Sequence, residues 1–332
     1  MSIFIPAEWA PRRALWTAWP SDGSLWRENL APAREEVAAM VRALADDGAG
    51  DNVRVLATGE EAMASANAAL GAAATVLPEP FGDIWLRDTG PIFARRNGEA
   101  VAIGFRFNGW GGKYELEGDD TLAGRIAERA KTRFIAHDFV LEGGAVEGDG
   151  AGAFLTTRQC LLNPNRNPGW TEAKAEEALR AALGAKKVLW LDEGLAGDHT
   201  DGHIDNLARF VGDARVVCQA PGGDDPNAEV LDDIAHALAG MEDAQGRKLE
   251  VVRIPSPGLV QDEDGGAMAA SHMNFLIGVG TVVVPVYNAR GEGAVEALKG
   301  VFPDHRVIGL KSNAILSGGG SFHCITQQEP RL

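Results

Sequence analysis

The sequence is poor in cysteine and lacks the cysteine spacing that metal sites use. Its three cysteines, Cys160, Cys218 and Cys324, are odd in number and lie far apart. This pattern argues against a disulfide framework and suits a reducing compartment, so we expect a cytoplasmic location. Because no Cys-x-x-Cys motif is present, a zinc ribbon is excluded.

Long apolar runs and a surplus of basic residues are also missing. No stretch is long and apolar enough to span a bilayer, and the first residues lack the basic region and apolar core of a signal peptide, so we expect no membrane partner. There are 31 basic against 47 acidic residues, a net charge of −16. This argues against a nucleic-acid partner, because neutralising phosphates requires a basic surface. An acidic surface suits a cationic small molecule, although solubility alone accounts for it.

The rest of the composition is that of a soluble globular protein, with 45% hydrophobic and 23% charged residues. A length of 332 residues allows one large domain or two ordinary ones. No linker invites a division, so we expect a single domain over residues 1–332. No Gly-x-Gly-x-x-Gly motif follows a first strand, which leaves a nucleotide cofactor unsupported.

Three similar modules occupy the second half of the chain, each predicted as a strand, a helix and a second strand. Their first strands begin at residues 154, 215 and 281, and dividing the whole chain by five gives roughly 66 residues per unit, a plausible size for a structural repeat. Alternating strands and helices would also allow one doubly wound parallel sheet. The predicted elements are 154–162, 171–183 and 187–191; 215–219, 228–239 and 249–254; and 281–286, 294–301 and 306–310.

A glycine-rich run near the C-terminus, Gly-Gly-Gly-Ser-Phe-His-Cys at 318–324, leads into a short β-prone stretch. Glycines leave room for a ligand or another segment to approach closely. Cys324 is a nucleophile if its surroundings permit a thiolate, and a buried inert thiol is the competing interpretation. Adjacent side chains of a strand point to opposite faces, so we expect His323 to face away from Cys324 and the base to lie elsewhere.

The best candidates for the base lie at 198–210. On an extended segment His203 and Asp205 share one face and supply an imidazole for proton transfer and a carboxylate for a cationic group. His199 and Asp201 alternate with them, so a metal-dependent hydrolase that uses the His199/His203 cluster is an alternative. That alternative gives the glycine-rich run before Cys324 no function.

The sequence contains three further motifs: Trp-Leu-Arg-Asp-Thr-Gly-Pro at 85–91, Trp-Gly-Gly at 110–112 and Leu-Glu-Gly-Gly at 141–144. Together with the two runs above, they resemble the agmatine deiminase and bacterial-type peptidylarginine deiminase family of the pentein, or guanidino-group-modifying, superfamily. The resemblance implies an α/β fold, a five-bladed α/β propeller of ββαβ repeats around a central active site. It implies neither a cofactor nor a metal.

The resemblance also implies the catalytic residues. Cys324 is expected to be the nucleophile, His203 the proton donor and activator of water, and Asp88 and Asp205 the carboxylates that clamp the guanidinium. Glu142 is expected to accept a hydrogen bond from His203 and so to fix its tautomer.

Other residues are expected to bind substrate or to support the site. Trp85, Trp110 and Gly320 are expected to bind substrate beside the two clamping aspartates. We expect Arg87 to brace its own loop. Cys160, like Cys218, is expected to be an inert core residue within an apolar strand.

The implied reaction is hydrolysis of agmatine to N-carbamoylputrescine and ammonia through a covalent cysteine thiouronium, catalysed by a single pentein domain that is compatible with a homodimer. Peptidylarginine or another guanidino compound is the alternative substrate, and a non-enzymatic pentein binding protein is the alternative function. The segment 113–120 departs from the family's pattern. Within it, Glu115 and Glu117 are candidates to bind the distal amine.

Overall fold

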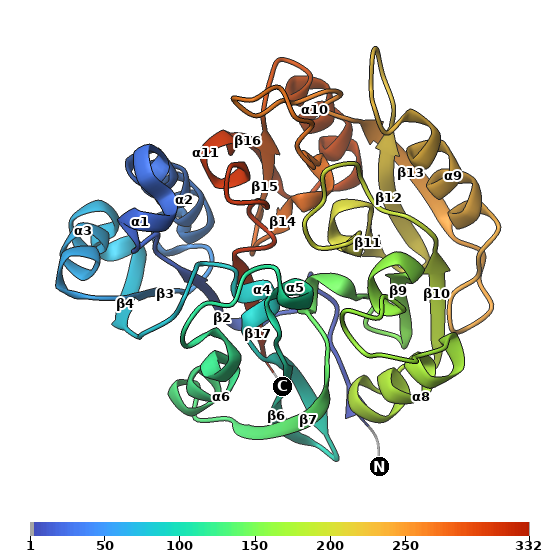
Figure 1. Cartoon of the computed structure of the whole chain (residues 1–332), viewed down its shortest axis with the longest axis horizontal. Coiled ribbons are helices and arrows are strands. Elements are labelled where there is room, and N and C mark those ends of the chain that lie inside the picture. Colours follow the sequence, from blue (N-terminus) through green and yellow to red (C-terminus); the bar gives the residue numbers. More distant parts are fainter. Residues whose placement is uncertain (1–2, 332) are drawn as a thin grey trace.

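The computed structural model describes residues 3–331, whose strands form five small sheets. In Figure 1 the sheets follow one another around the view, with the long helices toward its outside and the short helices α4 and α5 near its middle. In order across each sheet, the strands are β1 (Ile3–Phe4), β5 (Ile92–Arg96), β6 (Glu99–Arg106) and β7 (Arg133–Val140); β10 (Lys187–Leu191), β9 (Ala153–Thr157) and β8 (Glu147–Gly148); β11 (Ala208–Gly212), β12 (Arg215–Ala220) and β13 (Glu250–Pro255); β14 (Leu276–Ile277), β15 (Thr281–Val286) and β16 (Arg306–Lys311); and β17 (Thr326–Pro330), β2 (Arg12–Ala18), β3 (Val53–Ala57) and β4 (Ala74–Pro78).

One ββαβ unit recurs in four of these sheets. A strand pairs antiparallel with the next, a helix follows, and the third strand pairs parallel with the second. A parallel pair needs such a crossover, which a helix supplies. The three modules predicted from the sequence are therefore confirmed, and a single doubly wound sheet is wrong. The crossover helices are α6 (Asp119–Arg129), α8 (Glu172–Leu183), α9 (Ala228–Ala239) and α10 (Gly291–Val301).

The fifth sheet joins the two ends of the described chain. Strand β17 pairs antiparallel with β2, with Thr326 opposite Thr17, and β2, β3 and β4 are parallel. Helices α2 (Leu30–Ala45) and α3 (Glu60–Leu70) connect the parallel strands. This pairing fixes the segment just before β17, which contains Cys324.

Helix α2 shows how these helices are held. Its apolar stripe of Val37, Met40, Val41 and Leu44 is fully buried in the core cluster that includes Trp16, as the helical spacing predicts. Burying each large apolar side chain stabilises the fold by about 1.5–3 kcal/mol. Across residues 3–331, no helix combines the length and apolar character needed to cross a membrane.

Two local predictions are wrong. The strand expected over 154–162 ends at Thr157, whose side chain accepts a hydrogen bond from the Cys160 backbone and so begins a short helix. Cys160 lies in that helix, whereas Cys218 lies in strand β12 as expected. Cys324 lies in a turn instead of a strand. The short helices are α1 (Gly23–Trp26), α4 (Leu86–Thr89), α5 (Gly109–Gly112), α7 (Arg158–Leu161) and α11 (Asn313–Leu316).

Candidate active site

Cys324 is held in its turn by Asn274. The Asn274 side chain donates a hydrogen bond to the Cys324 sulfur at 3.0 Å. Its carbonyl oxygen accepts from the backbone amides of His323 at 3.0 Å and Cys324 at 3.1 Å. Sequence reasoning missed this residue, because a site 50 positions away in the chain carries no local sign of the contact.

The glycines before Cys324 leave room for an indole ring, as the sequence predicts. A Cβ atom at Gly320 would lie 2.7 Å from a ring carbon of Trp85 and 3.2 Å from the Cys324 sulfur. A Cβ atom at Gly318 would lie 2.8 Å from the same ring. Any side chain at either position would push Trp85 away from the sulfur.

The expectation that His323 faces away from the nucleophile is wrong. Backbone bonds from Ile325 to Ser321 and from Thr326 to His323 curl this segment, so the alternation of a strand does not apply. The Nδ1 atom of His323 lies 2.8 Å from Oδ2 of Asp205, and the Cys324 sulfur lies 3.4 Å from the same oxygen. His323 and the nucleophile thus share one carboxylate.

Behind His323 lies a second buried charged group. The His323 Nε2 atom is 3.3 Å from Oε2 of Glu8, which also accepts a hydrogen bond from Arg209. Burial, together with the cations Arg209 and Arg87, holds the pKa of His323 well below its ordinary value. His323 is therefore a neutral imidazole that positions Asp205 through the contact at Oδ2.

His203 and Asp205 do not lie on an extended segment, because Asp205 belongs to a 3-10 turn over Ile204–Asn206. They nevertheless reach the same place. The His203 Nδ1 atom lies 3.8 Å from Oδ2 of Asp88. Among the described residues, neither ring nitrogen of His203 nor the Oδ1 atom of Asp205 has a hydrogen-bond partner. Buried polar atoms are nearly always paired, so these three atoms indicate a polar ligand.

Asp88, on the short helix α4, is fixed through both carboxylate oxygens. Trp110 donates to Oδ2 at 2.9 Å, and the backbone amide of Gly144 donates to Oδ1 at 2.8 Å. A Cβ atom at Gly144 would lie 2.6 Å from His203 Nδ1 and 2.9 Å from Asp88 Oδ1. Gly144 thus allows the imidazole and the carboxylate to approach one another.

Arg87 braces its loop, as expected. Its backbone amide donates to the carbonyl oxygen of Cys324 at 3.0 Å, and its Nε atom donates to that of His323 at 3.3 Å. The side chain is buried, and burial lowers its pKa against the raising effect of Asp205.

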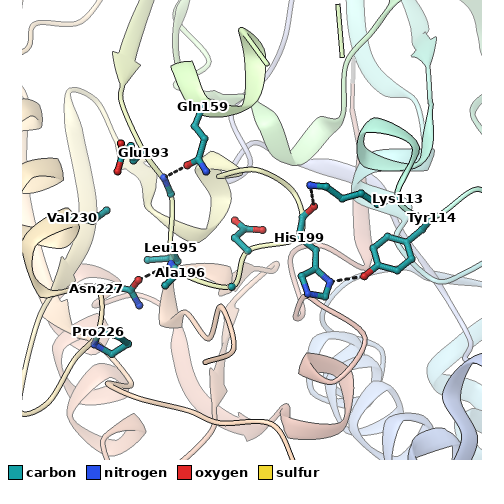
Figure 2. A pocket seen from close by; sticks show the side chains of 13 residues that line it. Lys113, Tyr114, Gln159, Glu193, Leu195, Ala196, His199, Pro226, Asn227 and Val230 are labelled. Atoms are coloured by element: carbon teal, nitrogen blue, oxygen red, sulfur yellow. Dashed lines mark hydrogen bonds between the residues drawn. The ribbon is translucent and has the colours of Figure 1, made fainter. Parts of the chain in front are cut away.

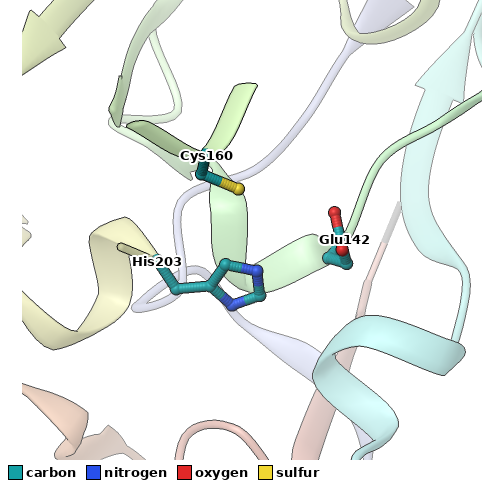
Figure 3. Close-up of side chains that lie close together, drawn as sticks. All are labelled: Glu142, Cys160 and His203. Atoms are coloured by element: carbon teal, nitrogen blue, oxygen red, sulfur yellow. The ribbon is translucent and has the colours of Figure 1, made fainter. Parts of the chain in front are cut away.

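The hydrogen bond expected between Glu142 and His203 is not formed. Glu142 instead accepts from Nε of Arg166 at 2.5 Å. Figure 3 shows Cys160 and Glu142 next to the His203 ring, and one ligand atom of each of the three lies within 4.8 Å of the others. The prediction fails because no motif near Glu142 or Arg166 indicates that these two side chains meet.

The charges around His203 set its protonation state. Burial opposes a charge on the ring, but the carboxylates of Asp88 and Glu142, together with the adjacent Cys160 thiol, outweigh it and raise the pKa of His203 well above its ordinary value. The imidazole therefore holds its proton at neutral pH and is ready to act as an acid. Burial raises the pKa of the Cys160 thiol, which is therefore not a competing nucleophile.

The pKa values of Cys324 and Asp205 are also raised, and a raised pKa favours the neutral form of a thiol or a carboxyl group. Burial, and then the charges of Asp205 and Asp88, raise the pKa of Cys324 well above its ordinary value. Burial also raises the pKa of Asp205 to about 7, although His203 opposes the shift. The free site therefore contains a neutral thiol.

The metal ligand set considered from the sequence does not converge. His199 lies at the protein surface, where its Nδ1 atom is 2.7 Å from the Tyr114 hydroxyl. Asp201 accepts from Lys113 and Arg166, each at 2.6 Å. These contacts leave His203 without either of the partners that the metal-dependent alternative requires.

Two other groups in residues 3–331 bring three potential ligands together, and an arginine contacts each. They are Glu142–Cys160–His203 and Glu8–Glu147–His323. Arg166 donates to Glu142, whereas Arg209 pairs with both glutamates of the second group. An arginine guanidinium thus supplies the positive charge next to the carboxylates of both groups.

A pocket of about 230 Å³ opens onto Cys324. Of the predicted residues, Trp85, Asp88, Trp110 and Gly320 line it together with the nucleophile. His203 and Asp205 lie beneath this lining, in contact with Asp88 and Cys324. The remaining lining residues are Leu25, Asp83, Tyr114, Leu116, His199, Thr200, Ser317, Gly318 and Gly319.

Comparisons with known proteins agree with this arrangement. The family model of the Porphyromonas-type peptidyl-arginine deiminases matches residues 4–330. An agmatine deiminase of Stutzerimonas stutzeri is 36% identical, with 98% of this chain and 95% of that protein aligned. The structure of an Enterococcus faecalis agmatine deiminase superimposes with a TM-score of 0.92 at 31% identity, covering 99% of this chain and 96% of that one.

A cysteine-to-serine agmatine deiminase of C. jejuni with substrate bound superimposes with a TM-score of 0.89 at 25% identity, covering 99% and 96% of the two chains. The mixed α/β fold also matches more distant structures of the pentein superfamily. The family match spans nearly the whole chain, including the residues that surround Cys324. The chain therefore belongs to the Porphyromonas-type peptidyl-arginine deiminase family.

Proposed function

We propose that this protein is an agmatine deiminase, which hydrolyses the guanidino group of agmatine to N-carbamoylputrescine and ammonia. Full-length relatives with that name support the activity. The observation that carries the proposal is the convergence of Cys324, Asp205, Asp88 and His203 at the inner end of one pocket, with three of their polar atoms unpaired.

Substrate binding uses the two carboxylates. A guanidinium is planar and matches carboxylate oxygens with pairs of N–H groups. Asp205 offers its unpaired Oδ1, and Asp88 is held in place by Trp110 and Gly144. Trp85 covers the guanidinium plane, because the glycines at 318 and 320 let its ring approach the sulfur.

The covalent step starts from the neutral thiol. The positive guanidinium cancels the charge of the carboxylates that disfavour a thiolate, so Cys324 releases its proton to solvent in the complex. Its sulfur forms a bond to the guanidino carbon. As the tetrahedral centre collapses, one C–N bond breaks, and the departing nitrogen takes a proton from His203 and leaves as ammonia.

Water completes the reaction. His203, now without its extra proton, accepts a proton from a water molecule that attacks the carbon of the thiouronium. The C–S bond breaks, the sulfur leaves with its electron pair, and the ureido product and the free cysteine result. Neither step requires an oxidant, a reductant or a further co-reactant.

We extend the proposal to the architecture. The five sheets, four of them built as ββαβ units, are the blades of a propeller with the site at its centre, and the described chain is one catalytic domain. The homodimer and the cytoplasmic location remain predictions. Peptidylarginine remains the competing substrate, because the family model carries that name.

The test is ammonia release and ureido-product formation from agmatine by the wild type and by two serine variants. Cys324→Ser should lower kcat by about 10³-fold or more, because the hydroxyl has no comparable activation. Cys218→Ser is the matched control, because this buried cysteine lies in strand β12, and its activity should stay near that of the wild type. The mechanism would be wrong if the reaction, quenched during turnover, left a covalent adduct on the Cys160 or Cys218 peptide, or if the Cys324→Ser variant were active.

A further inference from the structure

The pocket has an inner and an outer end that differ in exposure. Cys324, Asp88 and Trp110 are at most 7% exposed, whereas Tyr114 and Leu25 are 44% and 42% exposed. A guanidinium held at Cys324 therefore directs its aliphatic chain toward the exposed residues. The far end of the substrate meets that outer end.

Among the described residues that line the pocket, no carboxylate is exposed at the outer end. The lining contains two aspartates, and Asp88 belongs to the inner clamp. Asp83 is buried and is held by three donors: Oδ1 accepts from Trp26 and from the backbone of Ile84, and Oδ2 accepts from Trp85. The glutamates that the sequence suggested for an amine, Glu115 and Glu117, are exposed and do not line the pocket. An ammonium group therefore meets no dedicated counter-ion here.

A tyrosine–histidine pair lies at this place instead. The Tyr114 hydroxyl is 2.7 Å from Nδ1 of His199, and their rings stack with centroids 5.8 Å apart. The Tyr114 ring also packs edge-on against Trp110, the partner of Asp88. These contacts connect the outer pair to the clamp through one aromatic ring and fix its position.

The same pair also lines a second pocket, and Figure 2 shows both side chains at its edge, joined by their hydrogen bond. Lys113, beside it, donates to the His199 carbonyl and to Asp201. Where Nδ1 accepts the tyrosine proton, a neutral imidazole carries its own proton on Nε2. The pair then offers one N–H donor and one phenolic acceptor.

We propose that Tyr114 and His199 recognise the far end of the substrate by hydrogen bonding and stacking instead of ion pairing. Guanidines with an uncharged hydroxyl or amide end are therefore substrates on a par with agmatine. This inference rests on the proposed deiminase activity. An ion-paired ammonium would favour agmatine over an uncharged analogue by about 10- to 150-fold, whereas a neutral hydrogen bond is worth about 2- to 10-fold.

The experiment compares kcat/KM for agmatine, 4-guanidinobutan-1-ol and butylguanidine. In the wild type the alcohol should lie within about tenfold of agmatine. Tyr114→Phe removes the bond to His199 and should lower kcat/KM by about 2- to 10-fold for agmatine and the alcohol but not for butylguanidine, whose methyl end makes no hydrogen bond. His199→Glu places a carboxylate at the outer end and should raise the agmatine-to-alcohol ratio at least about tenfold.

Contrary results are readily distinguished. A wild type that prefers agmatine over the alcohol by more than about tenfold would overturn the proposal. So would a Tyr114→Phe variant that slows all three substrates equally, or a His199→Glu variant with an unchanged ratio. If none of the guanidines releases ammonia, the proposed deiminase activity itself fails.

Discussion

The inner and outer ends of the pocket bind the same substrate in opposite ways. At the inner end, His203 and Asp205 are fully buried and Cys324 is 5% exposed. At the outer end, Tyr114 is 44% exposed and contacts His199, which is also exposed. Charges interact strongly where water is excluded and weakly where it screens them, so we expect the inner end to supply rate and the outer end to supply selectivity.

The inner end also has a second layer that the outer end lacks. Asp205 contacts His323, which contacts Glu8, and Glu8 is paired with Arg209. Removing one member of such a buried group leaves a charge without its partner. Tyr114 and His199 contact solvent instead, and water can replace either of them. The largest predicted effects therefore lie at the inner end.

The largest effect expected from a clamp variant is that of Asp205→Asn. The substitution keeps the shape of the side chain but removes the charge opposite the guanidinium, which should lower kcat/KM for agmatine by roughly 10²- to 10³-fold. It also removes a carboxylate that disfavours the thiolate of Cys324. Iodoacetamide should therefore alkylate Cys324 faster in this variant than in the wild type at neutral pH.

The pH dependence of alkylation without substrate provides the decisive control. The wild-type rate should rise only well above neutrality, because burial and two carboxylates raise the pKa of Cys324. A Cys324 that titrates below neutrality in the free protein would show a pre-formed thiolate–imidazolium pair. Ionisation assisted by the substrate would then be wrong.

A smaller but still large effect is expected for Asn274→Leu. The change removes the donor to the Cys324 sulfur and leaves the Cys324 amide without its acceptor, whereas the His323 amide keeps the backbone carbonyl of residue 274. Each buried amide left unpaired costs about 1–3 kcal/mol. The displaced sulfur should lower kcat by roughly 10- to 100-fold, with a lower Tm.

The matched control for Asn274→Leu is His272→Gln, in the same 3-10 turn. His272 is bonded to the carbonyl oxygen of Pro255 and stacks on Tyr287, away from the nucleophile. It should lower the Tm while leaving kcat within about twofold of the wild type. If both variants lose kcat equally, Asn274 affects kcat only through the stability of the fold.

The difference between the two ends also explains what the sequence could predict. Cys324, His203, Asp205 and Asp88 belong to short motifs, and the structure brings all four together. The three strand–helix–strand modules were predictable because burial imposes a regular spacing on apolar residues. Motifs and periodicity are local signals, and they suffice for these features.

Contacts between distant segments were not predictable in the same way. The partner of Glu142 is Arg166 and that of Cys324 is Asn274, and neither pairing leaves a trace near its own motif. His323 was misplaced because the β-prone residues after the glycines suggest a strand, whereas the chain curls there. Tyr114 was missed because the segment around it follows no recurring pattern.

The pH dependence of binding tests the inner end more finely. Because the pKa of Asp205 is raised to about 7, agmatine binding below that pH must release a proton. In Cys324→Ser, which has no thiol to ionise, Kd should fall up to about tenfold per pH unit between pH 5.5 and 7, and then level off. Calorimetry in buffers of different ionisation enthalpy measures that proton release.

The same titration affects stability with a defined sign. The folded-state pKa of Asp205 exceeds the value of about 3.9 expected in the unfolded chain. Its contribution to stability is therefore fully present below pH 4 and is lost as the pH rises through about 7. Replacing Asp205 with Asn should flatten the pH dependence of Kd and that of stability. If both persist in that variant, another group causes them.

The smallest effect is expected at the outer end, for the double variant Glu115→Gln/Glu117→Gln. Both glutamates are exposed, and neither lines the pocket. Removing charges that water screens should change kcat/KM for agmatine by less than about twofold. His199 stacks on Tyr114, which belongs to the same segment, so His199→Glu adds a single charge inside the lining and should change selectivity far more. A fivefold or larger rise in KM for the double variant, without a change for butylguanidine, would show that residues 113–118 close over the ammonium group. The two ends of the pocket would then both bind cations by charge, and the contrast between them would disappear.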